Sequence, residues 1–195
     1  MEGCEITVIT NHILVSFCEH ALKKKSLYMW GTYGKPITSS LISSKAKQYP
    51  DRYSPARIAF LKRHADGTTV GCDCAGLIKW ALWTDGNIYG KIKYSAKTDR
   101  GAQGLFEASK EKGKINTMPN VPGIVLWKPG HVGVYVGNKE VIECTLGSRG
   151  DGIVKTPLSY GGWTYWLKVP EVMYIEDVAK KKMSILEKLK MVLRY

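Results

Sequence analysis

The 195-residue sequence has no long apolar run and no Lys or Arg before residue 23. No stretch of about 18 apolar residues occurs, so a membrane-spanning helix is not expected. The N-terminal segment carries Glu2 and Glu5, and Asn11 and His12 interrupt its apolar run, which argues against a secretory signal peptide. We therefore expect synthesis in the cytoplasm, with a separate export route for any target outside the cell.

The cysteines are odd in number and irregularly spaced, unlike the framework of a small domain held by disulfides. They are Cys4, Cys18, Cys72, Cys74 and Cys144. We interpret them as free thiols. The C-x-C at 72–74 has no second pair of Cys or His at ligand spacing, so no metal site is predicted, and no cofactor is expected.

Acidic residues are few: 17 Asp and Glu stand against 29 Lys and Arg, which gives a formal net charge of +12. Such a field favours polyanionic partners such as nucleic acid, anionic lipid or an acidic cell wall. No nucleic-acid-binding motif accompanies the charge, so a specific nucleic-acid partner is the least favoured. Length and a hydrophobic content of 44% are typical of one well-filled core, and we expect a monomer.

Helical periodicity dominates the first half of the chain, and short strand-like segments dominate the second. Helices are predicted at 13–25, 54–64, 74–82 and 100–112. Strands are predicted at 123–127, 131–137, 140–145 and 164–170, as an antiparallel meander. This order favours an α+β domain over a doubly wound α/β one.

Three segments need separate interpretation. Residues 26–36, rich in glycine and aromatics, are predicted to form a loop. The main domain is expected to span 1–170. Residues 171–195 are predicted to form a basic amphipathic helix that docks on this domain or begins a linker.

Cys74 stands at the predicted start of a helix, where free backbone N–H groups and the helix dipole stabilise a thiolate. Asp73 is suited to cap the same helix. The N–H groups of Asp73 and Cys74 are candidate donors to the oxyanion of a tetrahedral intermediate. The alternative for Cys74 is a small, buried hydrophobic residue, the usual state of a free cysteine.

A thiolate nucleophile needs a base, and His131 is the strongest candidate among the four histidines. It opens a predicted strand directly after the turn KPG, which gives its ring a rigid support. Glu143 on the next strand would orient the imidazole if an odd number of residues connects the two strands. An even connection would bring Cys144 to that face instead.

Four segments in the order YMWGTYG, DCAG, GHVGVYVGN and EVIEC carry a resemblance to a known family. Over roughly residues 13–170 they resemble the NlpC-type cysteine peptidases, papain-like enzymes that cut peptide bonds in bacterial peptidoglycan. The resemblance implies a papain-like fold with N-terminal helices packed on a central antiparallel sheet. It implies a catalytic triad of Cys74, His131 and Glu143, and a substrate contact from Tyr28.

The sequence departs from the family pattern at several positions. Ala75 replaces the usual serine, and Ile124 stands where many relatives have aspartate. Glu143 replaces the more frequent His, Asn or Gln. The stretch 35–70 is longer than the usual spacing between the aromatic element and the cysteine, and is a candidate wall of the substrate cleft.

The function implied by the resemblance is a cell-wall hydrolase, a cysteine endopeptidase that cuts stem peptides next to γ-D-glutamate through an acyl-enzyme. Its partners would be the stem peptides and the anionic wall. Without a signal peptide, the chain would reach the wall after lysis, as a phage endolysin does, or through a secretion system. Two alternatives stay open: an N-acetylmuramoyl-L-alanine amidase or acyltransferase with the same triad, and a noncatalytic wall-binding module.

Overall fold

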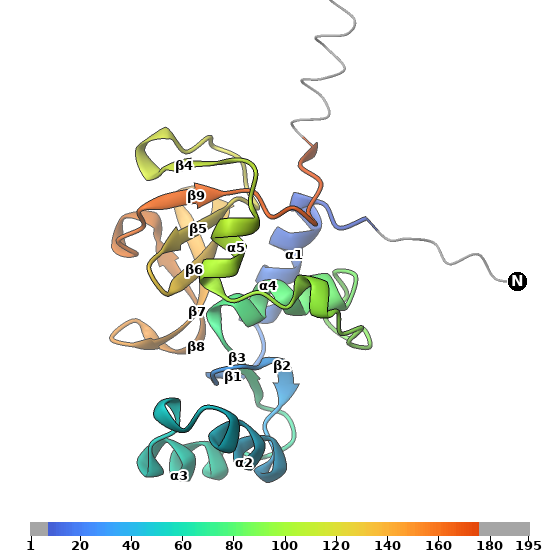
Figure 1. Cartoon of the computed structure of the whole chain (residues 1–195), viewed down its shortest axis with the longest axis vertical. Coiled ribbons are helices and arrows are strands. Elements are labelled where there is room, and N and C mark those ends of the chain that lie inside the picture. The colour runs from blue at the N-terminus through green and yellow to red at the C-terminus, as the bar shows by residue number, and fades with distance from the viewer. Residues whose placement is uncertain (1–7, 176–195) are drawn as a thin grey trace, which may run out of the picture.

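The structure, a computed structural model, describes residues 8–175 as helices packed on an antiparallel sheet (Figure 1). The predicted α+β class is confirmed. The C-terminal helix predicted within 171–195 lies outside the described residues from 176 onward. Residues 171–175 pack on the domain, because Val172 and Tyr174 are buried and Met173 bridges to Thr10.

The main sheet has six strands in the order β4-β9-β5-β6-β7-β8, and every neighbouring pair is antiparallel. The strands are β4 (Lys112–Lys114), β5 (Val125–Lys128), β6 (His131–Gly137), β7 (Glu140–Gly147), β8 (Gly150–Pro157) and β9 (Tyr165–Leu167). Four of them lie at predicted strands. Strands β4 and β8 were not predicted, and the opening Gly-Asp-Gly of β8 has the composition of a turn.

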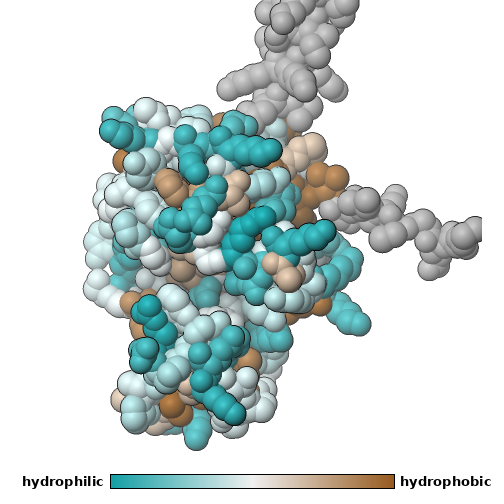
Figure 2. Space-filling view, in the orientation of Figure 1, coloured by the Kyte–Doolittle hydropathy of each residue, from teal (hydrophilic) through white to brown (hydrophobic). Residues whose placement is uncertain are grey.

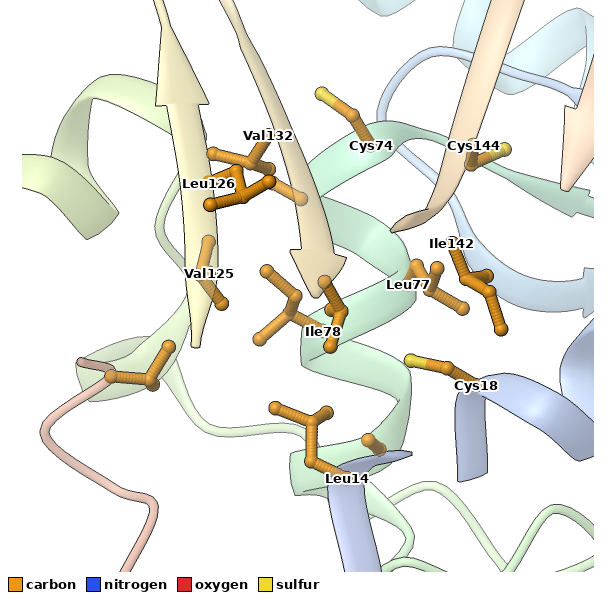
Figure 3. Packing of buried hydrophobic residues seen from close by; sticks show 14 of the residues in the cluster. Leu14, Cys18, Cys74, Leu77, Ile78, Val125, Leu126, Val132, Ile142 and Cys144 are labelled. Carbon is orange, nitrogen blue, oxygen red and sulfur yellow. The ribbon is translucent and has the colours of Figure 1, made fainter. Parts of the chain in front are cut away.

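Three helices accompany the sheet: α1 (Asn11–Leu22), α4 (Cys74–Trp83) and α5 (Ala102–Ala108). Helix α4 packs against β6 and β7, and α1 packs on α4. Figure 3 shows the aliphatic contacts between them, with Leu77 and Ile78 of α4 among side chains from α1 and the sheet. The short 3-10 turns η2 (Ala96–Thr98), η3 (Ile115–Thr117) and η4 (Leu158–Tyr160) connect these elements.

Helix α4 is the centre of the core. Its periodicity predicts one buried face, but nine of its ten residues are buried. The difference arises because the helix lies between the main sheet, α1 and a second, smaller sheet. A helix that is apolar on most sides is typical of such a central position.

The smaller sheet combines segments that were expected to form a loop. It contains β1 (Ser26–Tyr28), β3 (Val70–Cys72) and β2 (Tyr33–Pro36), in that order, with β1 parallel and β2 antiparallel to β3. The prediction of a loop at 26–36 was therefore wrong. Strands of three or four residues carry too little periodicity to be recognised without their partners.

A lobe formed by α2 (Ser39–Gln48), η1 (Pro50–Arg52) and α3 (Pro55–Arg63) extends from the smaller sheet, at the bottom of Figure 1. Ser54 caps α3 through the N–H of Arg57, as the sequence predicts. Much of the visible surface of this lobe and of the adjoining body is hydrophilic (Figure 2). Beneath it lies a separate apolar cluster of Leu27, Met29, Ile37, Ile42, Tyr53 and Leu61.

A partly buried ion pair holds the lobe against the main sheet. The guanidinium of Arg57 on α3 contacts both carboxylate oxygens of Asp151 on β8, at 2.5 and 2.8 Å. The same carboxylate accepts the N–H of Tyr28 on β1 at 2.9 Å, and Arg57 also donates to the carbonyl of Tyr28. This bidentate geometry fixes the orientation of the lobe as well as its position.

Within residues 8–175, no helix combines the length and the apolar character needed to cross a lipid bilayer.

Replacing Gly76 in α4 by Ala is expected to destabilise the fold by about 2–3 kcal/mol. A Cβ at this position would lie 1.9 Å from the carbonyl oxygen of Thr32 and 2.9 Å from Asp73 Oδ1, so backbone would have to move. Urea unfolding measures the change. Gly101→Ala is the control, since a Cβ there meets nothing within 4 Å. Equal unfolding midpoints for the two variants would contradict the close approach.

Candidate active site

Cys74 is the first residue of α4, and a local cap fixes the helix start. The carboxylate of Asp73 accepts the N–H of Gly76 at 2.5 Å, which confirms the predicted N-cap. Its second oxygen accepts the N–H of Gly31 at 2.7 Å. Asp73 therefore connects the first turn of α4 to the turn that follows β1.

The thiol of Cys74 is almost fully enclosed, with 5% of the residue exposed. Burial, followed by the charge of the Asp73 carboxylate, raises the pKa of this thiol to about 12. Hydrogen bonds from the N–H groups of Val132 and Ala75 act in the opposite direction. An isolated thiolate is thus disfavoured at neutral pH, and ionisation requires a neighbouring cation.

His131 opens β6 directly after Gly130, which turns the chain with a φ of +77°. Its Nε2 lies 2.6 Å from Oε2 of Glu143 on β7. With Nε2 engaged by the carboxylate, Nδ1 is the ring nitrogen left to accept a proton. The indole of Trp163 stacks on the imidazole at a centroid distance of 5.6 Å and an interplanar angle of 12°.

Strand register brings Glu143 to the histidine. Asn138 and Lys139, both with positive φ, form a two-residue turn between β6 and β7, and such an even turn alone would bring Cys144 to that face. The register shifts between Tyr135 and Gly137, which adds one residue to β6. The bulge restores the odd offset on which the predicted pairing of His131 and Glu143 depends.

Glu143 is fully buried and makes three polar contacts. Oε1 accepts the hydroxyl of Thr156 on β8 at 2.8 Å, and Oε2 lies 3.4 Å from Arg149 as well as beside His131. Burial opposes ionisation of this carboxyl, but hydrogen bonds from His131 and Thr156 and the charges of His131 and Arg149 outweigh it. Together they hold its pKa below the ordinary value. Sequence analysis missed both Thr156 and Arg149.

The sulfur of Cys74 lies at the start of β6, the strand that His131 opens. Val132, whose N–H contacts the sulfur, directly follows His131 in the chain. Figure 3 shows Cys74 at the end of α4, with Val132 on a neighbouring strand and the aliphatic core farther along the helix. The structure thus brings His131 and Glu143 into contact and places Cys74 at the strand end that bears His131.

The two backbone N–H groups proposed as oxyanion donors differ in availability. The N–H of Asp73 donates to the carbonyl of Thr32 at 3.1 Å, so it already has an acceptor within the fold. This corrects the prediction for Asp73. The N–H of Cys74, at the first position of α4, has no helical acceptor to its N-terminal side and stays the candidate donor.

Tyr28 ends β1 and lines a cavity together with His131. Burial raises the pKa of its phenol well above the ordinary value, and the charges of Cys74 and Asp73 add to the effect. The hydroxyl is therefore protonated at neutral pH and available as a donor. In the described part of the chain, no cluster of His, Cys, Asp and Glu has the arrangement needed to hold a metal ion.

Glu143→Gln is expected to have a lower free energy of unfolding than the wild type at neutral pH. This difference between the two proteins should become smaller in acid. The ordinary pKa of this carboxyl is 4.5, and its folded value is lower, so ionised Glu143 stabilises the folded state above that pH. The contribution is lost as pH falls through the folded pKa. Thermal unfolding of both proteins between pH 7 and about pH 3 measures the difference.

Glu107→Gln is the control for this comparison, because Glu107 is exposed on α5. Its unfolding curve should follow that of the wild type throughout the pH range. A deficit of Glu143→Gln that stays constant into acid would show that the carboxylate charge does not stabilise the fold.

No protein-family model and no curated protein matches the chain. The search of solved structures finds the NlpC/p60 domain of the peptidoglycan hydrolase SagA, at 11% identity and a TM-score of 0.43, covering 83% of this chain and 100% of that one. The peptidoglycan hydrolase RipB from Mycobacterium tuberculosis is similar at 19% identity and a TM-score of 0.44, covering 81% of this chain and 65% of that one.

NlpC2 from Trichomonas vaginalis is similar at 16% identity and a TM-score of 0.45, covering 82% of this chain and 48% of that one. The chain thus spans about half of NlpC2 and about two thirds of RipB. The SagA domain and NlpC2 carry the family name that the motifs around Cys74 and His131 resemble. Because identity and TM-score are both low, the functional assignment rests on the residues of this chain.

Proposed function

We propose that the protein is a cysteine peptidase that hydrolyses peptide bonds in the stem peptides of peptidoglycan. The observation that carries the proposal is the buried pair of His131 and Glu143, 2.6 Å apart, at the strand end that contacts the sulfur of Cys74. A thiol, an imidazole and an orienting carboxylate in this order are the components of thiol acyl transfer.

In the proposed reaction, Nδ1 of His131 takes the proton of the Cys74 thiol. The thiolate attacks the carbonyl carbon of the scissile bond, and the new oxyanion is stabilised by the N–H of Cys74 at the start of α4. The imidazolium then protonates the leaving amine as the C–N bond breaks. Water, deprotonated by the same imidazole, hydrolyses the thioester and releases the second product.

The high pKa of the Cys74 thiol agrees with this sequence of proton transfers. Burial disfavours a thiolate alone, but transfer to His131 creates an ion pair rather than an isolated charge. Glu143 is held in its ionised form 2.6 Å from Nε2 of His131, so its carboxylate faces the positive charge that the ring carries after the transfer. Proton transfer and ion-pair formation are therefore a single step.

The substrate class comes from the resemblance of the motifs to NlpC-type peptidases, which implies cleavage beside γ-D-glutamate. The net charge of +12 supports a target of opposite sign, and a wall rich in phosphate and carboxylate has that property. The chain would act after lysis or after delivery by a secretion system.

Cys74→Ala is expected to abolish lysis of purified walls, by at least about 1,000-fold in rate, because it removes the nucleophile. Turbidity loss of a wall suspension measures lysis, and co-sedimentation measures binding, which should persist. Cys18→Ala is the matched control, since it also removes one buried thiol but lies on α1. Unchanged lysis by Cys74→Ala would refute the catalytic role of Cys74, and binding without lysis by the wild type would favour a noncatalytic wall-binding module.

The bond that is cut distinguishes an endopeptidase from an amidase with the same triad. Digested walls should release fragments with a new amino terminus within the stem peptide, detected by mass analysis. Intact stem peptides released from muramic acid would instead identify an N-acetylmuramoyl-L-alanine amidase.

A further inference from the structure

A cavity of about 350 Å³ lies between the lobe of α2 and α3 and the proposed catalytic histidine. The body contributes Tyr28, His131 and Thr145 to its lining, and η1 with its flanking residue contributes Arg52 and Tyr53. Trp30 lines this cavity and also a second one of about 240 Å³ beside Cys74. The larger cavity is thus positioned to hold the part of a substrate next to its reacting carbonyl.

Two arginines face this cavity, and they differ in their partners. The guanidinium of Arg57 is neutralised by Asp151, with contacts at 2.5 and 2.8 Å. Arg52 forms no ion pair with any residue in the range 8–175, although the exposed Asp51 beside it lines the same cavity. The positive charge of Arg52 is therefore not neutralised by an ion pair within the described residues.

Aromatic stacking holds the guanidinium of Arg52 in place. Its central carbon lies 4.2 Å from the centroid of the Trp30 ring. Trp30 is in turn restrained, because its carbonyl accepts the hydroxyl of Tyr53 at 2.6 Å and the N–H of the following Gly31 donates to Asp73. The guanidinium of Arg52 forms no hydrogen bond within residues 8–175, so its N–H groups are available to a carboxylate, which a guanidinium can bind with two hydrogen bonds.

We propose that this cavity is a specificity subsite in which Arg52 binds a free carboxylate of the substrate within one or two residues of the scissile bond. The inference rests on the proposed function. The ligand class is a peptide with an acidic group in its backbone, and a γ-linked glutamate has one, because the linkage leaves the α-carboxylate free. Tyr28 lines the same cavity, and its protonated hydroxyl is the second candidate donor to that group.

The test uses two synthetic stem peptides that differ only in whether the glutamate α-carboxyl is free or a carboxamide. Wild-type protein should cleave the free acid about 10-fold to 100-fold more efficiently in kcat/KM, as expected for a charge-assisted bidentate contact. Arg52→Gln should cleave both peptides at the lower rate. Arg52→Lys, which keeps the charge but not the fork, should show an intermediate preference.

Asp51→Asn is the matched control, since it changes the neighbouring charge on the same turn. It should keep the preference for the free acid, because it leaves the guanidinium intact. An undiminished preference in Arg52→Gln would overturn the proposal, and so would equal cleavage of the two peptides by the wild type.

Binding separates this proposal from the proposed catalysis. In full-length Cys74→Ala, calorimetry should show tighter binding of the free acid than of the carboxamide, and Arg52→Gln in that background should remove the difference. If wild type cuts neither peptide but this preference is present, the proposed function fails and the subsite stands. If cleavage occurs without any preference in binding or rate, the subsite fails and the function stands.

Discussion

One buried carboxylate, that of Asp73, determines where the reactive sulfur lies. Its two oxygens accept N–H groups from Gly76 and Gly31, so the start of α4 and the turn after β1 form one unit. Cys74 follows Asp73 directly, and Trp30 precedes Gly31. The position of the thiol and the position of the indole that lines both cavities therefore depend on the same side chain. Burial raises the pKa of Asp73, and its two backbone hydrogen bonds oppose this effect.

The environment of the site disfavours a Cys74 thiolate and favours the ionised form of Glu143, which contacts the proposed base His131. Burial and the charge of Asp73 work against a Cys74 thiolate. Glu143, also buried, is nevertheless held ionised by contacts from three sides. In the proposed mechanism the proton of Cys74 passes to His131, so the thiolate forms together with an imidazolium that faces the ionised Glu143.

The sequence predicts those parts of the site that depend on local signals. Asp73 as a cap and Cys74 at a helix start follow from a few adjacent residues, and the structure has both. Pairing of His131 with Glu143 was predicted only conditionally, because it depends on a bulge between Tyr135 and Gly137 that no residue pattern reveals. Contacts from β8 were missed for a related reason. Without that strand and its register, nothing connects Thr156 to the carboxylate it contacts.

The stretch 35–70 shows how an insertion becomes part of a site. Its length was apparent in the sequence, but its role depends on Arg57, whose ion pair with Asp151 holds the lobe near the end of the sheet where β6 begins with His131. Arg57 holds the lobe through this pair. Arg52 on the adjoining turn forms no ion pair within the described residues, and we propose that it binds a ligand. The side of the cleft near Cys74 is lined mainly by small residues, and the side near His131 by polar and aromatic ones. With Arg52 in its proposed role, a substrate with a carboxylate on one side of its reacting carbonyl would bind in the direction that presents this carbonyl to the sulfur.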